Sequence, residues 1–106
     1  MEKIDIEIPG HISNDAELIA WIKGNANIFK PVMNLDESVY DPRAYLDSIH
    51  IKNVALVQDA LTIAYTFDYS VRVGCGETIF SGESVEDIIV GQRRSRFIHF
   101  ALQRDK

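Results

Sequence analysis

Four carboxylate side chains lie close together in the second half of the chain: Glu77, Glu83, Glu86 and Asp87. They lack the aspartate-rich spacing of a calcium-binding loop. They also lack any signature of the paired carboxylates that hydrolyse glycosidic bonds. An acidic surface that binds a basic protein is one interpretation, and three further residues would extend it: Asp36, Glu37 and Asp41. The alternative is a solvated hairpin face whose charges prevent strand edges from pairing.

The residues that could bind a transition metal or act as nucleophiles are few: His11, His50, His99 and Cys75. A zinc site typically uses closely spaced pairs of ligands, and this sequence contains none. Cys75 lies between two glycines, with no histidine nearby in sequence to activate its thiol. His99 could act as a general base only if the fold placed Asp68 beside it, so a structural histidine is the simpler interpretation. The sequence therefore predicts no catalytic residue, no metal site and no cofactor.

The charge of the chain is unevenly distributed. Residues 1–90 carry six basic and fifteen acidic side chains, a net charge of −9, whereas residues 91–106 carry +4. An acidic body disfavours binding to nucleic acid or to an anionic membrane, and it suits a basic protein partner. The simpler alternative is that the charge only aids solubility. The only basic cluster, Arg93, Arg94 and Arg96, is interpreted as a turn with solvated arginines rather than a nucleic-acid site.

The first half of the chain predicts one strand and two helices. Residues 3–8 alternate between charged residues and isoleucine, which is typical of a half-buried strand. Asn14 and Glu17 have the spacing of a capping box that opens a helix over residues 14–23, with Gly24 as a left-handed C-cap. Asp41-Pro42 predicts a second, short helix over residues 42–48.

From residue 50 the apolar residues recur with a period of two, which predicts strands. One strand surrounds Val54, and Gln58-Asp59 forms a tight turn. A long strand follows over residues 60–73, with these side chains on its apolar face: Leu61, Ile63, Tyr65, Phe67, Tyr69, Val71 and Val73. The next strand starts at Glu77, with a bulge at Gly82. Residues 84–91 could form a helix, but a strand is favoured. Residues 97–102 form a last strand that is central in the sheet or covered on both faces.

These elements predict a single α+β domain over residues 1–106, an antiparallel β-meander of four to five strands with two N-terminal helices packed on one face. Tyr65, Phe67 and Tyr69 are expected in the core, although in a curved sheet they could instead line a pocket. One cysteine excludes an intramolecular disulfide. Neither a signal-peptide pattern nor an apolar run long enough to span a membrane occurs, so a cytoplasmic location is expected.

A compact, acidic α+β chain with carboxylate-rich loops and no catalytic signature resembles the immunity proteins of bacterial toxin–immunity pairs, including those of contact-dependent growth inhibition systems. The resemblance is one of class over the whole chain, without a diagnostic motif. It implies a non-enzymatic inhibitor, a monomer in a heterodimer, that covers the active site or an adjacent surface of a basic, nuclease-type toxin domain. Tyr40 would then be an aromatic anchor among the acidic residues. The alternative is a small-molecule-binding or enzymatic domain with a pocket in a curved sheet over the helices.

Overall fold

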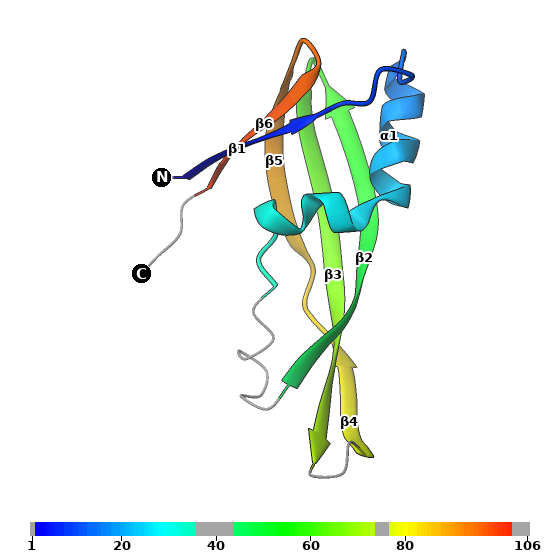
Figure 1. The fold of residues 1–106 in the computed structure, drawn as a ribbon, viewed down its shortest axis with the longest axis vertical. Coiled ribbons are helices and arrows are strands. Elements are labelled where there is room, and N and C mark those ends of the chain that lie inside the picture. Colours follow the sequence, from blue (N-terminus) through cyan, green and yellow to red (C-terminus); the bar gives the residue numbers. More distant parts are fainter. Residues whose placement is uncertain (1, 36–43, 74–76, 103–106) are drawn as a thin grey trace.

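The fold is a six-stranded antiparallel sheet with helices on one face (Figure 1). It is seen in a computed structural model that describes residues 2–35, 44–73 and 77–102. The elements in chain order are β1 (Glu2–Glu7), α1 (Asp15–Gly24), the 3-10 helix η1 (Ala26–Val32), β2 (Ala44–Val57), β3 (Ala60–Val73), β4 (Glu77–Glu83), β5 (Asp87–Arg94) and β6 (Phe97–Leu102). The predicted α+β class with an antiparallel sheet is confirmed, but the sheet has more strands than expected.

The sheet is organised around β3, which is as long as β2 and pairs with three other strands. Its strands follow the order β1-β6-β5-β3-β2, and β4 pairs with β3 beyond the end of β5. β4 and β5 are therefore two halves of one long partner of β3, interrupted at residues 84–86. This arrangement makes the molecule elongated, with extents of 49 × 29 × 20 Å, and β4 lies with the end of β3 in a projecting arm (Figure 1).

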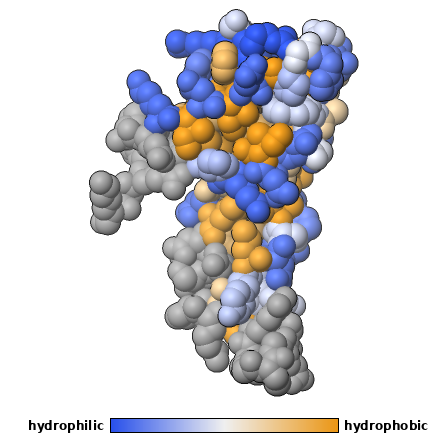
Figure 2. All heavy atoms as spheres, viewed as in Figure 1, coloured by the Kyte–Doolittle hydropathy of each residue, from blue (hydrophilic) through white to orange (hydrophobic). Residues whose placement is uncertain are grey.

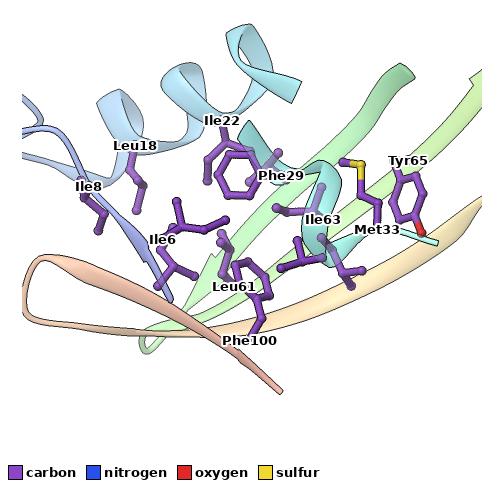
Figure 3. Packing of buried hydrophobic residues seen from close by; sticks show 14 of the residues in the cluster. Ile6, Ile8, Leu18, Ile22, Phe29, Met33, Leu61, Ile63, Tyr65 and Phe100 are labelled. Atoms are coloured by element: carbon purple, nitrogen blue, oxygen red, sulfur yellow. The ribbon is translucent and has the colours of Figure 1, made fainter. Parts of the chain in front are cut away.

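The face of the sheet that we call the inner face carries the core. Leu61, Ile63 and Tyr65 of β3 pack there with Leu18 and Ile22 of α1, as Figure 3 shows. A second cluster continues along β2 and β3 toward the arm: Ala44, Phe67, Tyr69 and Val71. Figure 2 shows that hydrophobic residues run along this side of the molecule. The prediction that β3 buries this side of its alternation in a core is confirmed, because Tyr65, Phe67 and Tyr69 are all buried.

Helix α1 begins as the sequence predicts and ends differently. Asn14 Oδ1 accepts the Glu17 backbone N–H at 2.8 Å, and Glu17 Oε1 accepts the Ser13 N–H and hydroxyl at 2.9 and 2.6 Å. The left-handed cap expected at Gly24 is wrong, since Gly24 is the last helical residue and Asn25 is the cap. The Asn25 amide nitrogen donates to the Trp21 carbonyl at 2.8 Å, which replaces the glycine cap and leads directly into η1.

The second helix, predicted over residues 42–48, is wrong where the structure describes it. Residues 44–48 belong to β2, and the proposed cap Asp41-Pro42 lies outside the described residues. The register of β2 against β3 shifts between Leu46 and Ser48 and again between Ile51 and Asn53. Each shift inserts one extra residue, Asp47 or Lys52, which interrupts the two-residue period that marks a strand in sequence.

Of the other predictions about the strands, the turn and the strand assignment are confirmed and the bulge is wrong. The Gln58-Asp59 turn is confirmed, and both residues have positive φ angles of 51° and 70°. The choice of strand for the ambiguous segment is confirmed for residues 87–91 in β5. The bulge expected at Gly82 is wrong, because the register shift lies opposite the step from Val71 to Arg72. Gly82 instead lies against the Tyr69 ring, where a Cβ atom would meet Oη at 2.8 Å.

The last strand, β6, is covered on one face only. Ile98 and Phe100 point inward and are 0% and 1% exposed, whereas Phe97 on the opposite face is 41% exposed. Of the two predicted arrangements, a central position is confirmed, since β6 pairs with both β1 and β5, and cover on both faces is wrong. The reason is that β6 lies between β5 and β1 with its second apolar side on the face opposite the helices.

Candidate functional site

The outer face of the sheet, opposite α1 and η1, carries the candidate site. Both helices pack against the inner-face core, and within residues 2–35, 44–73 and 77–102 no helix covers the outer face. Because side chains alternate along a strand, the strand registers state which residues share this face. The registers show that the outer face has an apolar part and a polar part, which follow one another along β3.

The apolar part, which we call the outer apolar strip, crosses β2, β3 and β5. Val90 lies beside Thr62 and Ile88 beside Ala64, while Thr62 and Ala60 lie opposite residues of β2. The strip consists of Ala55, Val57, Ala60, Thr62, Ala64, Ile88 and Val90. Its large members are well exposed: Val57 by 67%, Ile88 by 55% and Val90 by 61%. A contiguous row of exposed apolar side chains on a sheet is typical of an interaction surface.

The polar part continues the same face toward the arm. We call it the outer polar cluster: Asp47, Ser48, His50, Lys52, Thr66, Asp68, Ser70 and Glu83. Asp68 lies at its centre, with Ser48 directly opposite on β2 and Glu83 directly opposite on β4. His50 is the diagonal neighbour of Asp68, within reach of its carboxylate. The cluster thus draws on three adjacent strands.

The two bulges of β2 help to build this cluster. An inserted residue places two successive side chains on one face, where a regular strand would place one. Asp47 and Ser48 therefore both reach the outer face, and so do Lys52 and Asn53, which agrees with their exposure. The bulge after Leu46 thus places the Asp47 carboxylate on the same face as Ser48, His50 and Lys52, which alternate regularly along β2.

Hydroxyl groups orient the three carboxylates of the cluster. Ser48 Oγ donates to Asp68 Oδ2 at 2.9 Å, Thr66 Oγ1 donates to Glu83 Oε2 at 3.0 Å, and Ser70 Oγ donates to Asp47 Oδ1 at 3.1 Å. Thr66 and Ser70 are themselves only 4% and 2% exposed. Buried hydroxyls on a central strand therefore position carboxylates that are accessible to solvent.

His50 and the Lys52 ammonium complete the cluster and contact its carboxylates. His50 Nε2 lies 2.6 Å from Asp68 Oδ2, and Lys52 Nζ lies 3.2 Å from Glu83 Oε2. The hydrogen bonds from His50 and then Ser48 hold the pKa of the Asp68 carboxyl below its usual value. Those from Lys52 and then Thr66 likewise lower the pKa of Glu83. Both carboxylates are accordingly ionised at neutral pH.

Ser48, His50 and Asp68 have the residue types of a hydrolytic triad but not its geometry. A triad places the serine and the aspartate on opposite nitrogens of the imidazole ring. Here Ser48 Oγ and Asp68 Oδ2 both lie near Nε2, at 3.3 and 2.6 Å. Ser48 also donates its hydroxyl proton to Asp68. This arrangement orients Asp68 and does not activate the serine.

The lowered pKa values predict a loss of stability in acid. A carboxyl whose pKa is lower in the folded state stabilises the fold above its unfolded pKa, near 3.8 for Asp68 and 4.5 for Glu83. That contribution is lost as pH falls through the lowered, folded values. Urea unfolding between about pH 6 and about pH 2.5 should therefore show a fall that is shallower in Asp68→Asn. An equal slope in Asp68→Asn and wild type would contradict this assignment.

The surface of the described residues has several shallow depressions, and one of them lies next to the outer polar cluster. The depression beside Asp68 has a volume of about 370 Å³ and is lined by Asp47, Asp68, Tyr69, Ser81 and Gly82. Another, of about 360 Å³, lies over β1, β5 and β6 beside His99. Neither lies between the sheet and the helices. A smaller depression, of about 250 Å³, lies between the start of α1 and the β5–β6 turn, where Asp15 and Leu18 face Arg93 and Arg96. It is polar at its rim and stands at the end of the helix, not beneath it as the alternative from the sequence would require.

The carboxylates predicted to bind a partner do not share one face. Glu83 points outward with Asp68, whereas Asp87 shares the inner face with its neighbour Tyr65 and accepts the Tyr65 hydroxyl at 3.2 Å. Burial raises the pKa of that hydroxyl to about 12, which keeps it a donor. Glu86 is exposed between β4 and β5. Asp36, Glu37, Tyr40 and Asp41 lie outside the described residues, as does the side chain of Glu77.

Two arginines of the basic cluster hold the fold together. The Arg93 guanidinium pairs with Asp15 at 2.8 Å and with Asp59 at 2.6 Å. Arg96 donates to the carbonyls of Ile8, Pro9 and Ile12. The predicted turn is confirmed at Ser95-Arg96, and Arg96 is exposed. Both arginines are nevertheless bonded, since they fasten the N-terminal segment and α1 to the β2–β3 and β5–β6 turns.

His50 and His99 each contact a carboxylate that was not predicted from the sequence to be its partner. His99 Nδ1 lies 2.6 Å from Asp5 Oδ1 on the neighbouring strand β1, and Asp68 is paired with His50 instead. The hypothetical pair of His99 with Asp68 is therefore wrong. Cross-strand registers create both real pairs, and only the correct pairing of β2 with β3 could have revealed the one at His50.

No family model, curated protein or solved structure matches this chain. Among the described residues, no helix is both long enough and apolar enough to cross a membrane.

Proposed function

We propose that this chain is a non-enzymatic inhibitor that binds a basic protein, as an immunity protein binds its cognate nuclease-type toxin domain in the cytoplasm. The observation that supports it is the outer face of the sheet, where an exposed apolar strip adjoins oriented carboxylates. Stable protein interfaces commonly combine an apolar centre with polar groups that specify the partner.

The outer apolar strip would supply the centre of the interface. Ile88 and Val90 stand over the small residues Ala64 and Thr62, so the strip is a shallow surface that a partner's side chains can cover. Removing such side chains from water is favourable by about 25 cal/mol per Å² of apolar area. This term is independent of salt and would hold the complex once it has formed.

The outer polar cluster would supply charge complementarity. Asp47, Asp68 and Glu83 are held in place before binding, so a basic partner would not need to order them. Lysine and arginine side chains that bind phosphate in a nuclease could bind these carboxylates instead. The net charge of −9 over residues 1–90 would also accelerate the encounter with a basic partner at low salt.

A catalytic role receives less support from the same face. The Ser48 hydroxyl donates to Asp68, which leaves Ser48 without a general base in the described part of the chain. The inner face is filled by side chains of the core, such as Leu61 and Phe29, each 0% exposed. A pocket beneath the helices, as the small-molecule alternative requires, is not favoured by that packing.

The proposal is tested by co-expressing the chain with the product of the gene adjacent to its own and purifying the complex. We expect a one-to-one complex with a basic protein that weakens as salt rises. Val90→Arg, on the β5 side of the strip, should weaken binding by more than about tenfold, because it buries a charge and repels a basic partner. Binding is measured by calorimetry or surface plasmon resonance.

The matched control is Ile28→Arg. Ile28 is also an exposed apolar residue, 42% accessible, but it lies on η1, which packs on the inner face. The Ile28→Arg variant should bind the partner protein with the same affinity as the wild type. Equal losses in both variants, no stable complex, or affinity that does not change with salt would each count against the proposal. A homodimer seen by light scattering and abolished by Val90→Arg would favour self-association through the strip instead.

A further inference from the structure

The outer polar cluster contains a set of ligand atoms that suits a metal ion. We propose that His50, Asp68 and Glu83 form a binding site for one divalent transition-metal ion, with zinc as the best match. This inference does not rest on the proposed inhibitor function, since it concerns only the geometry of the free chain. The ligand atoms of these three side chains all lie within 4.8 Å of one another.

The chemistry of the three donors points to zinc rather than to calcium or magnesium. Calcium and magnesium prefer sites made of oxygen ligands, often six or more. One imidazole nitrogen with two carboxylates is a ligand set that zinc uses in open sites, where water completes the coordination. Two ligand atoms bound to one zinc ion lie about 3.3 Å apart, given metal–ligand distances of about 2.0–2.1 Å. Modest side-chain rotations would bring the present atoms to that spacing.

The three ligands come from three adjacent strands, which fixes their positions. His50 lies on β2, Asp68 on β3 and Glu83 on β4, and the backbone hydrogen bonds of the sheet hold the three strands in register. Ligands on paired strands keep their separation more reliably than ligands on a loop. The site therefore requires no movement of the backbone.

Neighbouring hydroxyls already provide the outer hydrogen bonds that metal ligands need. Ser48 donates to Asp68 Oδ2 and the buried Thr66 donates to Glu83 Oε2. Within the described part of the chain, Asp68 Oδ1 and Glu83 Oε1 accept no hydrogen bond, so each carboxylate retains an oxygen for a metal ion. Such outer partners orient ligands and contribute to metal affinity.

A cation already occupies the neighbourhood of the proposed ion. The Lys52 ammonium lies 3.2 Å from Glu83 Oε2, and the His50 ring is hydrogen-bonded to Asp68. Zinc binding would turn Lys52 away and would require His50 Nε2 to be without its proton, which then resides on Nδ1 or is released to water. The long lysine side chain is exposed and can turn without disturbing the sheet.

The exposure of the three ligands leaves room for the rest of the coordination sphere. The side chains of His50, Asp68 and Glu83 are 45%, 38% and 47% exposed. Three protein ligands leave a fourth position for water or for a group from a bound molecule. The proposed centre is therefore open to solvent on the outer face.

The experiment is a titration of the full-length chain with zinc chloride by calorimetry, repeated with cobalt(II) to record its visible absorption. All variants carry Cys75→Ser, which removes the thiol as a competing ligand. We expect one ion per chain and a cobalt spectrum typical of four or five ligands. His50→Ala and Glu83→Gln should each weaken binding at least about tenfold. Lys52→Ala should strengthen it about fivefold, by removing a positive charge close to the ion.

The matched control is His99→Ala. His99 makes the same contact with a carboxylate, 2.6 Å from Asp5, but no third ligand joins that pair among the described residues. This variant should bind zinc as the parent does. The proposal is overturned if His50→Ala binds zinc normally, if His99→Ala loses binding, or if the parent takes up no ion. Circular dichroism verifies that each variant is folded, and partner binding measured in chelator separates this result from the inhibitor function.

Discussion

Replacing Phe29 with alanine is expected to lower the free energy of unfolding by about 3–5 kcal/mol. Phe29 lies in η1, is 0% exposed, and packs its ring edge-on against Trp21 at 5.7 Å and Phe100 at 6.3 Å between ring centroids. It thus joins α1, η1 and β6 in a single contact (Figure 3). The loss removes both the buried apolar surface and the packing around it. The total free energy of unfolding of a domain of this size is typically only about 5–15 kcal/mol, so the variant should be marginally stable.

The neighbouring residue supplies the control for this experiment. Ile28 precedes Phe29 in the same 3-10 helix but is 42% exposed. Urea unfolding should show a large fall in midpoint for Phe29→Ala and a loss below about 1 kcal/mol for Ile28→Ala. Similar losses in the two variants would mean that η1 does not pack on the sheet as described here.

Gly91→Ala is expected to destabilise the fold by about 1–3 kcal/mol through overpacking. Gly91 lies in β5 with its α-carbon on the inner face, opposite Phe100. A Cβ atom there would come within 2.6 Å of the Phe100 ring and 2.9 Å of the Ile98 methyl group. Both side chains are fully enclosed by the core, so neither can move aside without opening a gap elsewhere.

Gly24→Ala is the matched substitution with the opposite expected sign. Gly24 ends α1, and a Cβ atom there would meet nothing within 4 Å. Alanine should stabilise a helical position by up to about 1 kcal/mol relative to glycine. Thermal unfolding of the two variants should therefore shift in opposite directions. A Gly91→Ala protein as stable as wild type would show that β5 and β6 approach less closely than the structure indicates.

The outer face connects both functional proposals to these stability arguments. Residues that hold the core together point inward from the sheet, while the residues proposed to bind a partner or zinc point outward from β2, β3, β4 and β5. Substitutions such as Val90→Arg or His50→Ala should therefore change binding with little effect on unfolding. This separation makes the binding experiments interpretable.

The misassigned segment at residues 42–48 illustrates how tertiary structure overrides a local pattern. Asp41-Pro42 is a common way to begin a helix, and the alternation of β2 is interrupted at Asp47 and Lys52. Pairing with the long strand β3 supplies a hydrogen-bonded ladder on both sides of those interruptions. The gain from this ladder thus outweighs a weak helical preference, which is worth only tenths of a kcal/mol per residue.

The candidate site shows the same limitation more strongly. His50, Asp68 and Glu83 are separated by 18 and 15 residues, and no spacing rule for metal sites covers such distances. Of these, only Glu83 was among the residues predicted to bind a partner. His50 was set aside because no second histidine or cysteine lies near it in sequence. The three meet because β3 pairs with β2 on one side and β4 on the other.

The sequence by itself determined the α+β class, the capped start of α1, the turn at Gln58-Asp59 and the long strand from Ala60 to Val73. Each of these depends on local chemistry: a side-chain cap, a two-residue turn, or an apolar period over neighbouring residues. Only the tertiary structure decided the strand order, the bulges of β2 and the convergence of carboxylates on the outer face. Those features depend on which strands pair and in what register, and register is set by long-range contacts that no local window contains.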